Sequence, residues 1–273
     1  MTLAAGFKFE HPKAQGVSPI LLLSDSRYSR GTQPYRDDGK KICILAKNIY
    51  AAFAGDVLTA QRALARVKEY LALSSSGTFE DLVKILKSSF DSEIIPGDPQ
   101  TPHCILGAIS TNGNSKLLYA RPDKTCYEYE VSERSQAVIG LQNLEPKLWK
   151  KINEPKPKGL WRPEHFMFLP DVVFPSGYDR KQRAIQDARE ISRNILWEFL
   201  EIVDDPRVDG ANPPLQNVLL LPSRSEVIDC YELNVSSIKS PKITRKTARA
   251  REVYEEPDSG SRAIVELNVW DST

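Results

Sequence analysis

The sequence predicts an α+β protein in which β-sheets pack together and helices cover them from the outside. Strand patterns occur in pairs, and the first two helix patterns follow one another as a block. A third and longer helix pattern stands between the later strands. Because strands and helices do not alternate regularly, this order favours packed sheets with outer helices over βαβ units.

Two pairs of strands are predicted in the first part of the chain. Residues 3–9 and 20–23 are apolar runs. The segment between them, EHPKAQGVSP, contains the Pro and Gly that are typical of a hairpin connection. Residues 41–45 and 49–53 form the second pair, which Gly55 closes.

Two successive helices are predicted next. From Asp56 onward apolar residues recur at intervals of three and four, which is the spacing of one helix face. This face consists of Val57, Ala60, Leu64, Val67 and Leu71. Thr78 and Asp81 resemble a capping box at the start of a second helix. The apolar face of this second helix consists of Leu82, Ile85 and Leu86.

Strand patterns return in residues 103–132. Asn112-Gly113 within this segment is a strong signal for a hairpin turn. Residues 136–140, QAVIG, form one more short strand. This part of the chain is therefore expected to extend the sheets.

The second half of the chain contains a proline-rich insertion, the longest helix and a last pair of strands. Residues 153–178 hold five prolines, which interrupt any periodic element. Residues 179–203 show the longest helical pattern. Residues 217–221 and 227–233 are predicted to be the two strands of a hairpin.

The composition favours a soluble cytoplasmic protein with reduced cysteines. The 37 Lys and Arg residues balance the 36 Asp and Glu residues, so net charge does not favour nucleic acid or a membrane as the main partner. No apolar run approaches the roughly 18 residues of a membrane helix, and the N-terminus lacks the pattern of a signal peptide. The 4 cysteines are far apart and show no C-x-x-C spacing.

Residues 239–251 form a basic segment with six Lys or Arg residues and no acid. Acidic residues follow between Glu252 and Asp258. Neighbouring charge runs of this kind favour a solvated surface that neutralises itself, and binding of nucleic acid or another partner is the alternative. We therefore predict one domain over residues 1–238, with the proline-rich insertion inside it, and a C-terminal extension over residues 239–273.

Four short stretches near the N-terminus have a spacing that is found in a known family. They are TLAAGFKF at residues 2–9, ILLLSDSR at residues 20–27, KKICIL at residues 40–45 and IYAAFAG at residues 49–55. Lys41 follows Asp25 by sixteen residues, and Gly55 follows Lys41 by fourteen. In these features the chain resembles proteasome β-type subunits, which are N-terminal nucleophile (Ntn) hydrolases. The resemblance implies a four-layer αββα sandwich that assembles into homo-oligomeric rings.

The resemblance also implies a threonine hydrolase that cleaves peptide or amide bonds. Thr2 is then the nucleophile after removal of Met1, because an N-terminal α-amine, whose ordinary pKa is about 8, can act as the base for the hydroxyl beside it. The charge of Lys41 favours deprotonated neighbours, and Asp25 holds Lys41 charged and oriented. Gly55 matches the family's oxyanion donor through its backbone N–H.

Three features depart from the family pattern. Leu141 stands in IGLQN, where the family usually has a serine near the terminal amine. Asp209 is the nearest candidate for the Asp that the family places before the last strand pair, and Asp204 and Asp205 are its rivals. The first hairpin is seven residues longer than the usual spacing, so its tip is expected to protrude.

A non-catalytic subunit or binding scaffold with the same fold is the alternative function. In that case Thr2 is an ordinary early residue, and Asp25 and Lys41 form a structural ion pair. Gly55 then serves only the tight turn between a strand and a helix.

No cofactor or metal is predicted. His11, His103 and His165 lack the spacing of metal ligands, so they are interpreted as core or surface residues. The expected partners are a peptide or amide substrate and further copies of the chain in a ring. The basic segment 239–251 is a possible contact for another partner.

Overall fold

The computed structural model describes separate stretches of the chain, and every structural statement below concerns these residues. They are residues 3–10, 18–25, 28–30, 33–36, 40–73, 81–94, 101–110, 112–140, 146–148, 150, 180–203, 215–222, 225–237 and 240–252. The proline-rich insertion predicted at 153–178 lies outside them.

The first sheet has six strands in the order β10-β1-β2-β11-β12-β13. These strands are β1 Leu3–Lys8, β2 Ile20–Ser24, β10 Gln136–Gly140, β11 Gln216–Leu220, β12 Ser225–Ser237 and β13 Ser240–Glu252. All neighbours in this sheet are antiparallel. The N-terminal strand β1 therefore lies inside the sheet, between β10 and β2.

The second sheet is an antiparallel meander of five strands that follow one another in chain order. They are β5 Ile42–Ala46, β6 Ile49–Ala54, β7 His103–Ile109, β8 Ser115–Pro122 and β9 Tyr129–Glu133. Gly113, in the turn from β7 to β8, has a φ of 90°, a backbone conformation that favours glycine. The hairpin predicted at Asn112-Gly113 is thus confirmed.

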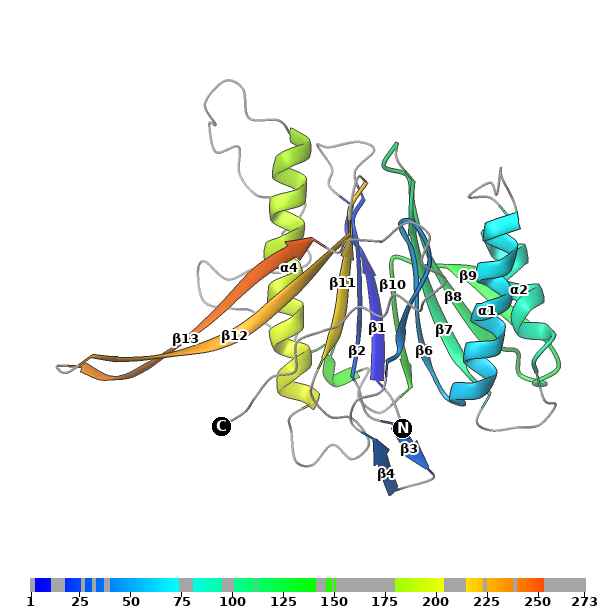
Figure 1. The fold of residues 1–273 in the computed structure, drawn as a ribbon, viewed down its shortest axis with the longest axis horizontal. Helices are drawn as coiled ribbons and strands as arrows, with labels where there is room; N and C mark the ends of the chain where they lie inside the picture. Colours follow the sequence, from blue (N-terminus) through cyan, green and yellow to red (C-terminus); the bar gives the residue numbers. More distant parts are fainter. Residues whose placement is uncertain are drawn as a thin grey trace.

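Among the described residues, long helices cover the outer faces of the sheets (Figure 1). They are α1 Val57–Leu73, α2 Leu82–Asp91 and α4 Arg180–Val203. α4 contributes Phe199 to an apolar cluster that includes Leu21 of β2. α1 and α2 contribute Leu64 and Phe90 to a cluster that includes Leu106 of β7. Each sheet therefore has helices on the face that is turned away from the other sheet.

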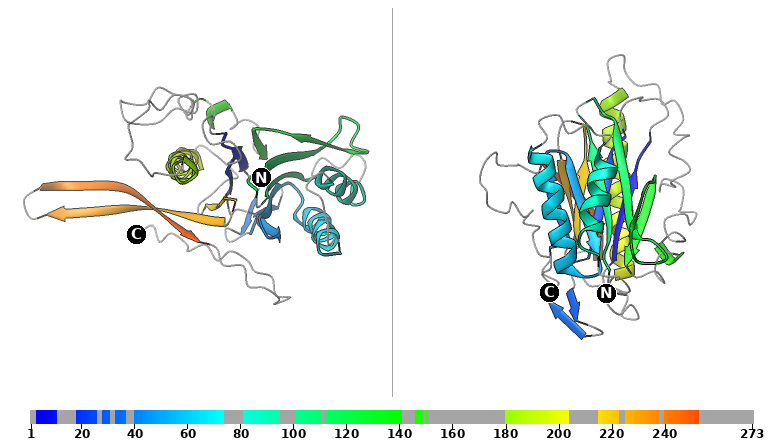
Figure 2. Two further views of the ribbon diagram at one scale, coloured as in Figure 1. Left: turned by 90° about the horizontal axis from the view of Figure 1, so that it is seen from above. Right: turned by 90° about the vertical axis from the view of Figure 1, so that its right-hand side faces the viewer.

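The two sheets pack face to face (Figure 2), and the side chains of a third apolar cluster lie between them. Ile20 and Leu22 of β2 belong to this cluster. Leu21 and Leu23 belong to the cluster under α4. Because successive side chains of a strand point to opposite faces, β2 is buried on both sides. Burial on both sides explains why this strand is a continuous apolar run in the sequence.

The predicted α+β class is confirmed, with two antiparallel sheets and helices on their outer faces. The small hairpin of β3 Tyr28–Arg30 and β4 Gln33–Arg36 was not predicted. It lies beyond the edge of the sheets at which β1 begins (Figure 1). Asp81 stands at the N-cap of α2 without a capping hydrogen bond from its side chain, and Thr78 lies outside the described residues. Asp81 is thus the N-cap itself and not the third helical residue that the predicted capping box requires.

β12 and β13 form a long hairpin whose far part extends away from the two sheets (Figure 1). In the described part of the chain, β12 pairs with β11 through Ser225 and Glu226, and it pairs with β13 over nearly its whole length. The predicted domain boundary between residues 238 and 239 falls between β12, which ends at Ser237, and β13, which begins at Ser240. Most of the basic segment 239–251 is thus part of a strand of the first sheet.

Candidate active site

A buried ion pair joins the ends of two strands that belong to different sheets. Asp25 directly follows β2, and Lys41 directly precedes β5. Lys41 Nζ lies 2.9 Å from Asp25 Oδ1, and the two side chains are 1% and 0% exposed. Burying an ion costs several kcal/mol unless pairing and hydrogen bonds offset it. The contact therefore holds these two strand ends against each other.

The same carboxylate also contacts the start of β1. Leu3 N–H donates to Asp25 Oδ1 at 2.9 Å. Asp25 N–H donates in return to the Leu3 carbonyl at 3.0 Å. Ser24 Oγ, which is also buried, lies 3.3 Å from the Leu3 carbonyl and 2.9 Å from the Asp25 carbonyl. Backbone and side-chain hydrogen bonds thus tie the first described residue of the chain to the ion pair.

Gln216, the first residue of β11, belongs to the same cluster, although sequence reasoning missed it. Its Oε1 accepts the N–H of Lys41 at 2.9 Å and the N–H of Ile42 at 3.2 Å. Gln216 is 7% exposed and lies opposite Ser24 in the pairing of β11 with β2. A buried polar side chain needs hydrogen-bond partners. The position of a glutamine at the start of an apolar strand was therefore the one sequence signal for this contact.

Two glycines with positive φ stand at the same edge of the sheets. Gly55, with a φ of 108°, lies between β6 and α1. Phe53 N–H donates to the Lys41 carbonyl at 3.3 Å, so the end of β6 that leads to Gly55 lies beside Lys41. Gly140, with a φ of 98°, ends β10 and pairs with Leu3. Glycine adopts these φ values without the strain that other residues incur.

The structure describes three of the predicted catalytic residues and brings them to one edge of the sheets. They are Asp25, Lys41 and Gly55. Asp25 and Lys41 are in direct contact. Gly55 follows the strand that pairs with the backbone of Lys41. The other residues discussed for the site lie outside the described part of the chain and are Thr2, Leu141, Asp204, Asp205 and Asp209.

His103 is a further polar residue at this edge. It begins β7 and pairs with Ala54, the residue before Gly55. Its Nδ1 lies 2.9 Å from the Tyr119 hydroxyl. Burial lowers the pKa of His103, and the charge of Arg121 lowers it further. The imidazole is therefore neutral near pH 7, where it acts as a hydrogen-bonding group and carries no charge.

Within the described ranges, no group of three or more His, Cys, Asp or Glu residues is placed to hold a metal ion. Cys43 and Cys104 are free. Burial raises the pKa of Cys43 to about 11, against a smaller opposing effect of Lys68. Burial also raises the pKa of Cys104. Both thiols are therefore protonated near neutral pH, which is the less reactive form.

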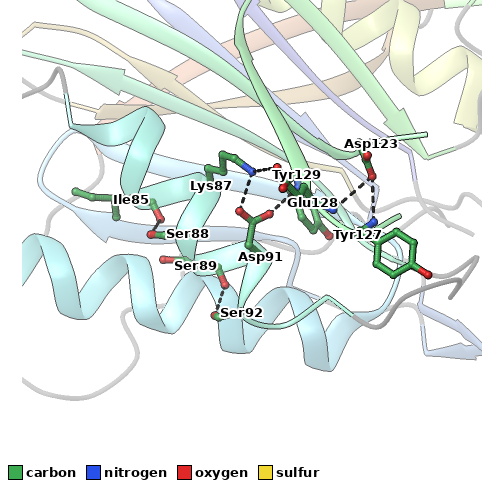
Figure 3. A network of polar contacts seen from close by, with 10 residues as sticks. All are labelled: Ile85, Lys87, Ser88, Ser89, Asp91, Ser92, Asp123, Tyr127, Glu128 and Tyr129. Carbon is green, nitrogen blue, oxygen red and sulfur yellow. Dashed lines mark hydrogen bonds and ion pairs between the residues drawn. The ribbon is translucent and has the colours of Figure 1, made fainter. Parts of the chain in front are cut away.

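A second polar cluster connects α2 with the start of β9 (Figure 3). Lys87 Nζ lies 2.8 Å from Asp91 Oδ2 and 3.0 Å from Glu128 Oε2. The hydrogen bond to Asp91 is the main reason why the pKa of Lys87 is raised. Asp91 Oδ1 accepts the N–H of Tyr129 at 2.6 Å. These contacts join a helix to a strand, and we interpret the cluster as structural.

No known protein family matches the chain, and no curated protein matches it significantly. Among the described residues, no helix is both long and apolar enough to cross a membrane. Function therefore has to be inferred from the site itself.

Proposed function

We propose that this chain is a threonine-type peptidase or amidase of the Ntn-hydrolase class, with Thr2 as the nucleophile after removal of Met1. The observation that carries the proposal is the buried pair of Lys41 and Asp25, whose carboxylate also accepts the N–H of Leu3. Leu3 follows Thr2 in the sequence. The ion pair thus contacts the backbone one residue downstream of the proposed nucleophile.

The proposed fold is the four-layer αββα sandwich of this class. Its support is the position of the large apolar clusters in the described residues, which lie under α4, between the sheets, and under α1 and α2. In such a fold the ends of strands from both sheets meet at one edge. The Asp25–Lys41 contact is an example, because its two residues follow and precede strands of different sheets.

The proposed reaction begins when Thr2 Oγ attacks the carbonyl carbon of the substrate and the α-amine of Thr2 accepts the hydroxyl proton. The C–N bond of the substrate then breaks, its nitrogen takes up that proton, and the amine product leaves. Thr2 now carries the acyl group as an ester. A water molecule attacks the ester carbonyl and gives its proton to the same amine. The acid product leaves when Oγ regains that proton.

Lys41 is proposed to keep the α-amine of Thr2 in its neutral, proton-accepting form. A nearby positive charge disfavours a second positive charge, so an ammonium beside the amine favours loss of the amine's proton. The carboxylate of Asp25, 2.9 Å from Lys41 Nζ, offsets the cost of burying that ammonium. The carboxylate therefore fixes the position of the Lys41 ammonium in a region from which water is largely excluded.

Gly55 is proposed to stabilise the oxyanion that forms when Thr2 attacks. Gly55 is exposed at the turn between β6 and α1, at the same edge of the sheets as Lys41. One backbone N–H aimed at a developing oxyanion contributes about 3 to 4 kcal/mol of transition-state stabilisation. The absence of a side chain leaves room for a substrate carbonyl next to this N–H.

A non-catalytic scaffold is the second candidate, and the burial of the ion pair favours it. The side chains of Asp25 and Lys41 are 0% and 1% exposed, which also suits a purely structural contact between the sheets. The residue after Gly140 is Leu141, which has no hydroxyl to assist proton transfer. The two functions differ in whether Thr2 becomes N-terminal and reacts.

Labelling with a peptide epoxyketone tests the proposal, because this reagent closes a ring with both the hydroxyl and the α-amine of an N-terminal threonine. The intact mass of the purified full chain first shows whether Met1 has been removed. We expect a mature protein that begins at Thr2 and gains the mass of one reagent molecule. Peptide mass spectrometry should locate the added mass on Thr2.

Three variants serve as controls for this labelling. Thr2→Ala removes the hydroxyl and should abolish labelling, whereas Thr2→Ser keeps a hydroxyl and should retain part of it. Thr125→Ala removes an exposed threonine whose Oγ1 donates to Asp123 at 2.6 Å, and it should leave labelling unchanged. Labelling that survives in Thr2→Ala contradicts the proposed nucleophile. An unlabelled wild-type protein that retains Met1 supports the scaffold.

A further inference from the structure

We infer that Gln216 is a positioning residue for Lys41 in the proposed reaction, on which this inference rests. Gln216 stands 175 residues after Lys41 in the sequence, yet its side-chain carbonyl accepts the Lys41 N–H. The bond crosses from the first sheet, which contains β11, to the first strand of the second sheet. Gln216 therefore acts on the lysine across the boundary between the sheets.

One oxygen of Gln216 holds two consecutive backbone donors at the start of β5. Its Oε1 lies 2.9 Å from Lys41 N and 3.2 Å from Ile42 N. Gln216 is 7% exposed, Ile42 is 7% exposed and Lys41 is fully buried. Because water has little access to replace a lost acceptor there, removal of this side chain would break both hydrogen bonds without replacing them.

The backbone position of Lys41 decides where its ammonium lies. A lysine side chain is a flexible four-carbon stem, so it places a charge accurately only when both of its ends are held. Asp25 holds the far end through Nζ. Gln216 holds the near end through the backbone N–H, and Phe53 N–H contacts the Lys41 carbonyl. Of these two backbone contacts, the one made by Gln216 comes from the first sheet, which contains β1 and β2.

Strand pairing fixes Gln216 relative to Asp25. Gln216 lies opposite Ser24 in the register of β11 and β2, and Ser24 directly precedes Asp25. The two residues that hold Lys41 from the first sheet are thus adjacent across one strand pair. Gln216 therefore sets the distance between the backbone of Lys41 and the carboxylate that its ammonium must reach.

The decisive variants are Gln216→Met, which keeps the length of the side chain but removes the acceptor, and Gln216→Glu, which keeps an acceptor at the same place. Tyr129→Phe is the matched control. It removes a buried hydrogen bond of 2.7 Å from the hydroxyl of Tyr129, in β9, to the carbonyl of Pro102, which directly precedes β7. All measurements use the full chain.

The first readout is acetylation of Lys41 by limiting acetic anhydride, measured by peptide mass spectrometry against the exposed Lys47. It requires no enzymatic activity. We expect Gln216→Met to raise the rate at Lys41 relative to Lys47 about tenfold, the factor that corresponds to loss of one such hydrogen bond. Tyr129→Phe should leave the ratio unchanged, even if it unfolds at a lower urea concentration.

The second readout is the rate of epoxyketone labelling at Thr2 as a function of pH. Gln216→Met should slow labelling about 100-fold, which is the cost of a misplacement of about 1 Å in a catalytic group. Gln216→Glu should recover most of this rate. The added negative charge of the glutamate favours the protonated amine, so the rising limb of the profile should move to higher pH.

The outcomes separate this inference from the proposed function. If Gln216→Met leaves both the Lys41 acetylation ratio and the labelling rate at the values of Tyr129→Phe, Gln216 is structural and the inference is wrong. If the wild type is not labelled at Thr2 after Met1 is removed, the proposed function fails and the catalytic role of Gln216 fails with it. A raised acetylation ratio in that case still shows that Gln216 holds Lys41.

Discussion

Lys41 is one of the largest fully buried side chains among the described residues. A buried lysine needs a partner, and the spacing in the sequence pointed to Asp25, which the structure places 2.9 Å from Lys41 Nζ. The contact of Asp25 with the Leu3 N–H was not predicted. This contact depends on the register of β1 and β2, in which Ala4 lies opposite Ser24. Asp25 follows Ser24 and Leu3 precedes Ala4, so the antiparallel register brings Asp25 next to Leu3.

We predict that Lys41→Met lowers both stability and turnover. Methionine keeps much of the packing of the lysine stem but leaves Asp25 buried without its partner, at a cost of about 3 to 5 kcal/mol in unfolding free energy. The double variant Lys41→Met, Asp25→Asn removes both charges, and Asn keeps an oxygen that can accept the Leu3 N–H. It should regain stability without regaining turnover. Urea unfolding and hydrolysis of a demonstrated substrate measure the two effects.

The exposed pair of Lys87 and Asp91 provides the control for this prediction. It combines the same residue types at 2.8 Å, but the side chains are 38% and 30% exposed. Because exposed helical pairs contribute only about 0.3 to 0.5 kcal/mol, Lys87→Met should change stability little and turnover not at all. If the double variant at Lys41 and Asp25 regained hydrolysis, the charge of Lys41 would have no part in the reaction.

Gln216 shows what residue-level reasoning could not find. Its two backbone partners are 175 and 174 residues away, so no local motif relates them. A buried glutamine at the start of a strand indicates that a hydrogen-bond partner exists, but sequence alone does not identify it. Thr2 and Asp209 remain predictions, because both lie outside the described residues.

At the scale of elements, hydrophobic periodicity was sufficient wherever an element has an apolar face. β2, β6, α1 and α4 begin within one residue of the predicted positions. β13 was missed because five of its 13 residues are Lys or Arg, which were interpreted as part of a charged surface. Thr and Ile between those charges are residues that strands favour, and the pairing with β12 was not visible from composition.

Gly6 of β1 permits the close approach of the two sheets, and we predict that Gly6→Ala destabilises the protein. An added Cβ would lie 2.8 Å from Ile105 Cγ2 and 2.9 Å from Leu117 Cδ1, both in the second sheet. Overpacking of this kind costs about 1 to 3 kcal/mol. The entropy that alanine removes from the unfolded chain returns only about 0.4 to 1 kcal/mol. Urea denaturation should therefore show a net loss.

Gly107 of β7 is the matched position on the facing sheet. A Cβ there would lie 3.0 Å from Ile20 Cγ2 and 3.1 Å from Leu220 Cδ1, which requires smaller shifts. Gly107→Ala should therefore cost less than Gly6→Ala. Equal stabilities for wild type and Gly6→Ala would mean that the sheets are not packed as closely as the structure indicates.

At the scale of the whole molecule, the class of the fold could be predicted but the order of strands in the first sheet could not. The second sheet follows chain order, as hairpin signals suggest. In the first sheet, by contrast, β1 pairs with β10 and β2 pairs with β11, over separations of more than a hundred residues. Local patterns define where strands are and do not define which distant strands pair.

The strand order of the first sheet has a consequence for how the chain folds. All strands of the second sheet lie within residues 42–133, whereas β2 cannot gain its second neighbour until residues 216–220 have joined. Pairings between distant segments close large loops and form slowly. In pulsed hydrogen exchange during refolding, amides of β6 and β7 should become protected before those of β2; simultaneous protection would contradict this order. The Lys41 backbone contact with Gln216 then forms late, so a partly folded chain has not yet assembled the proposed catalytic centre.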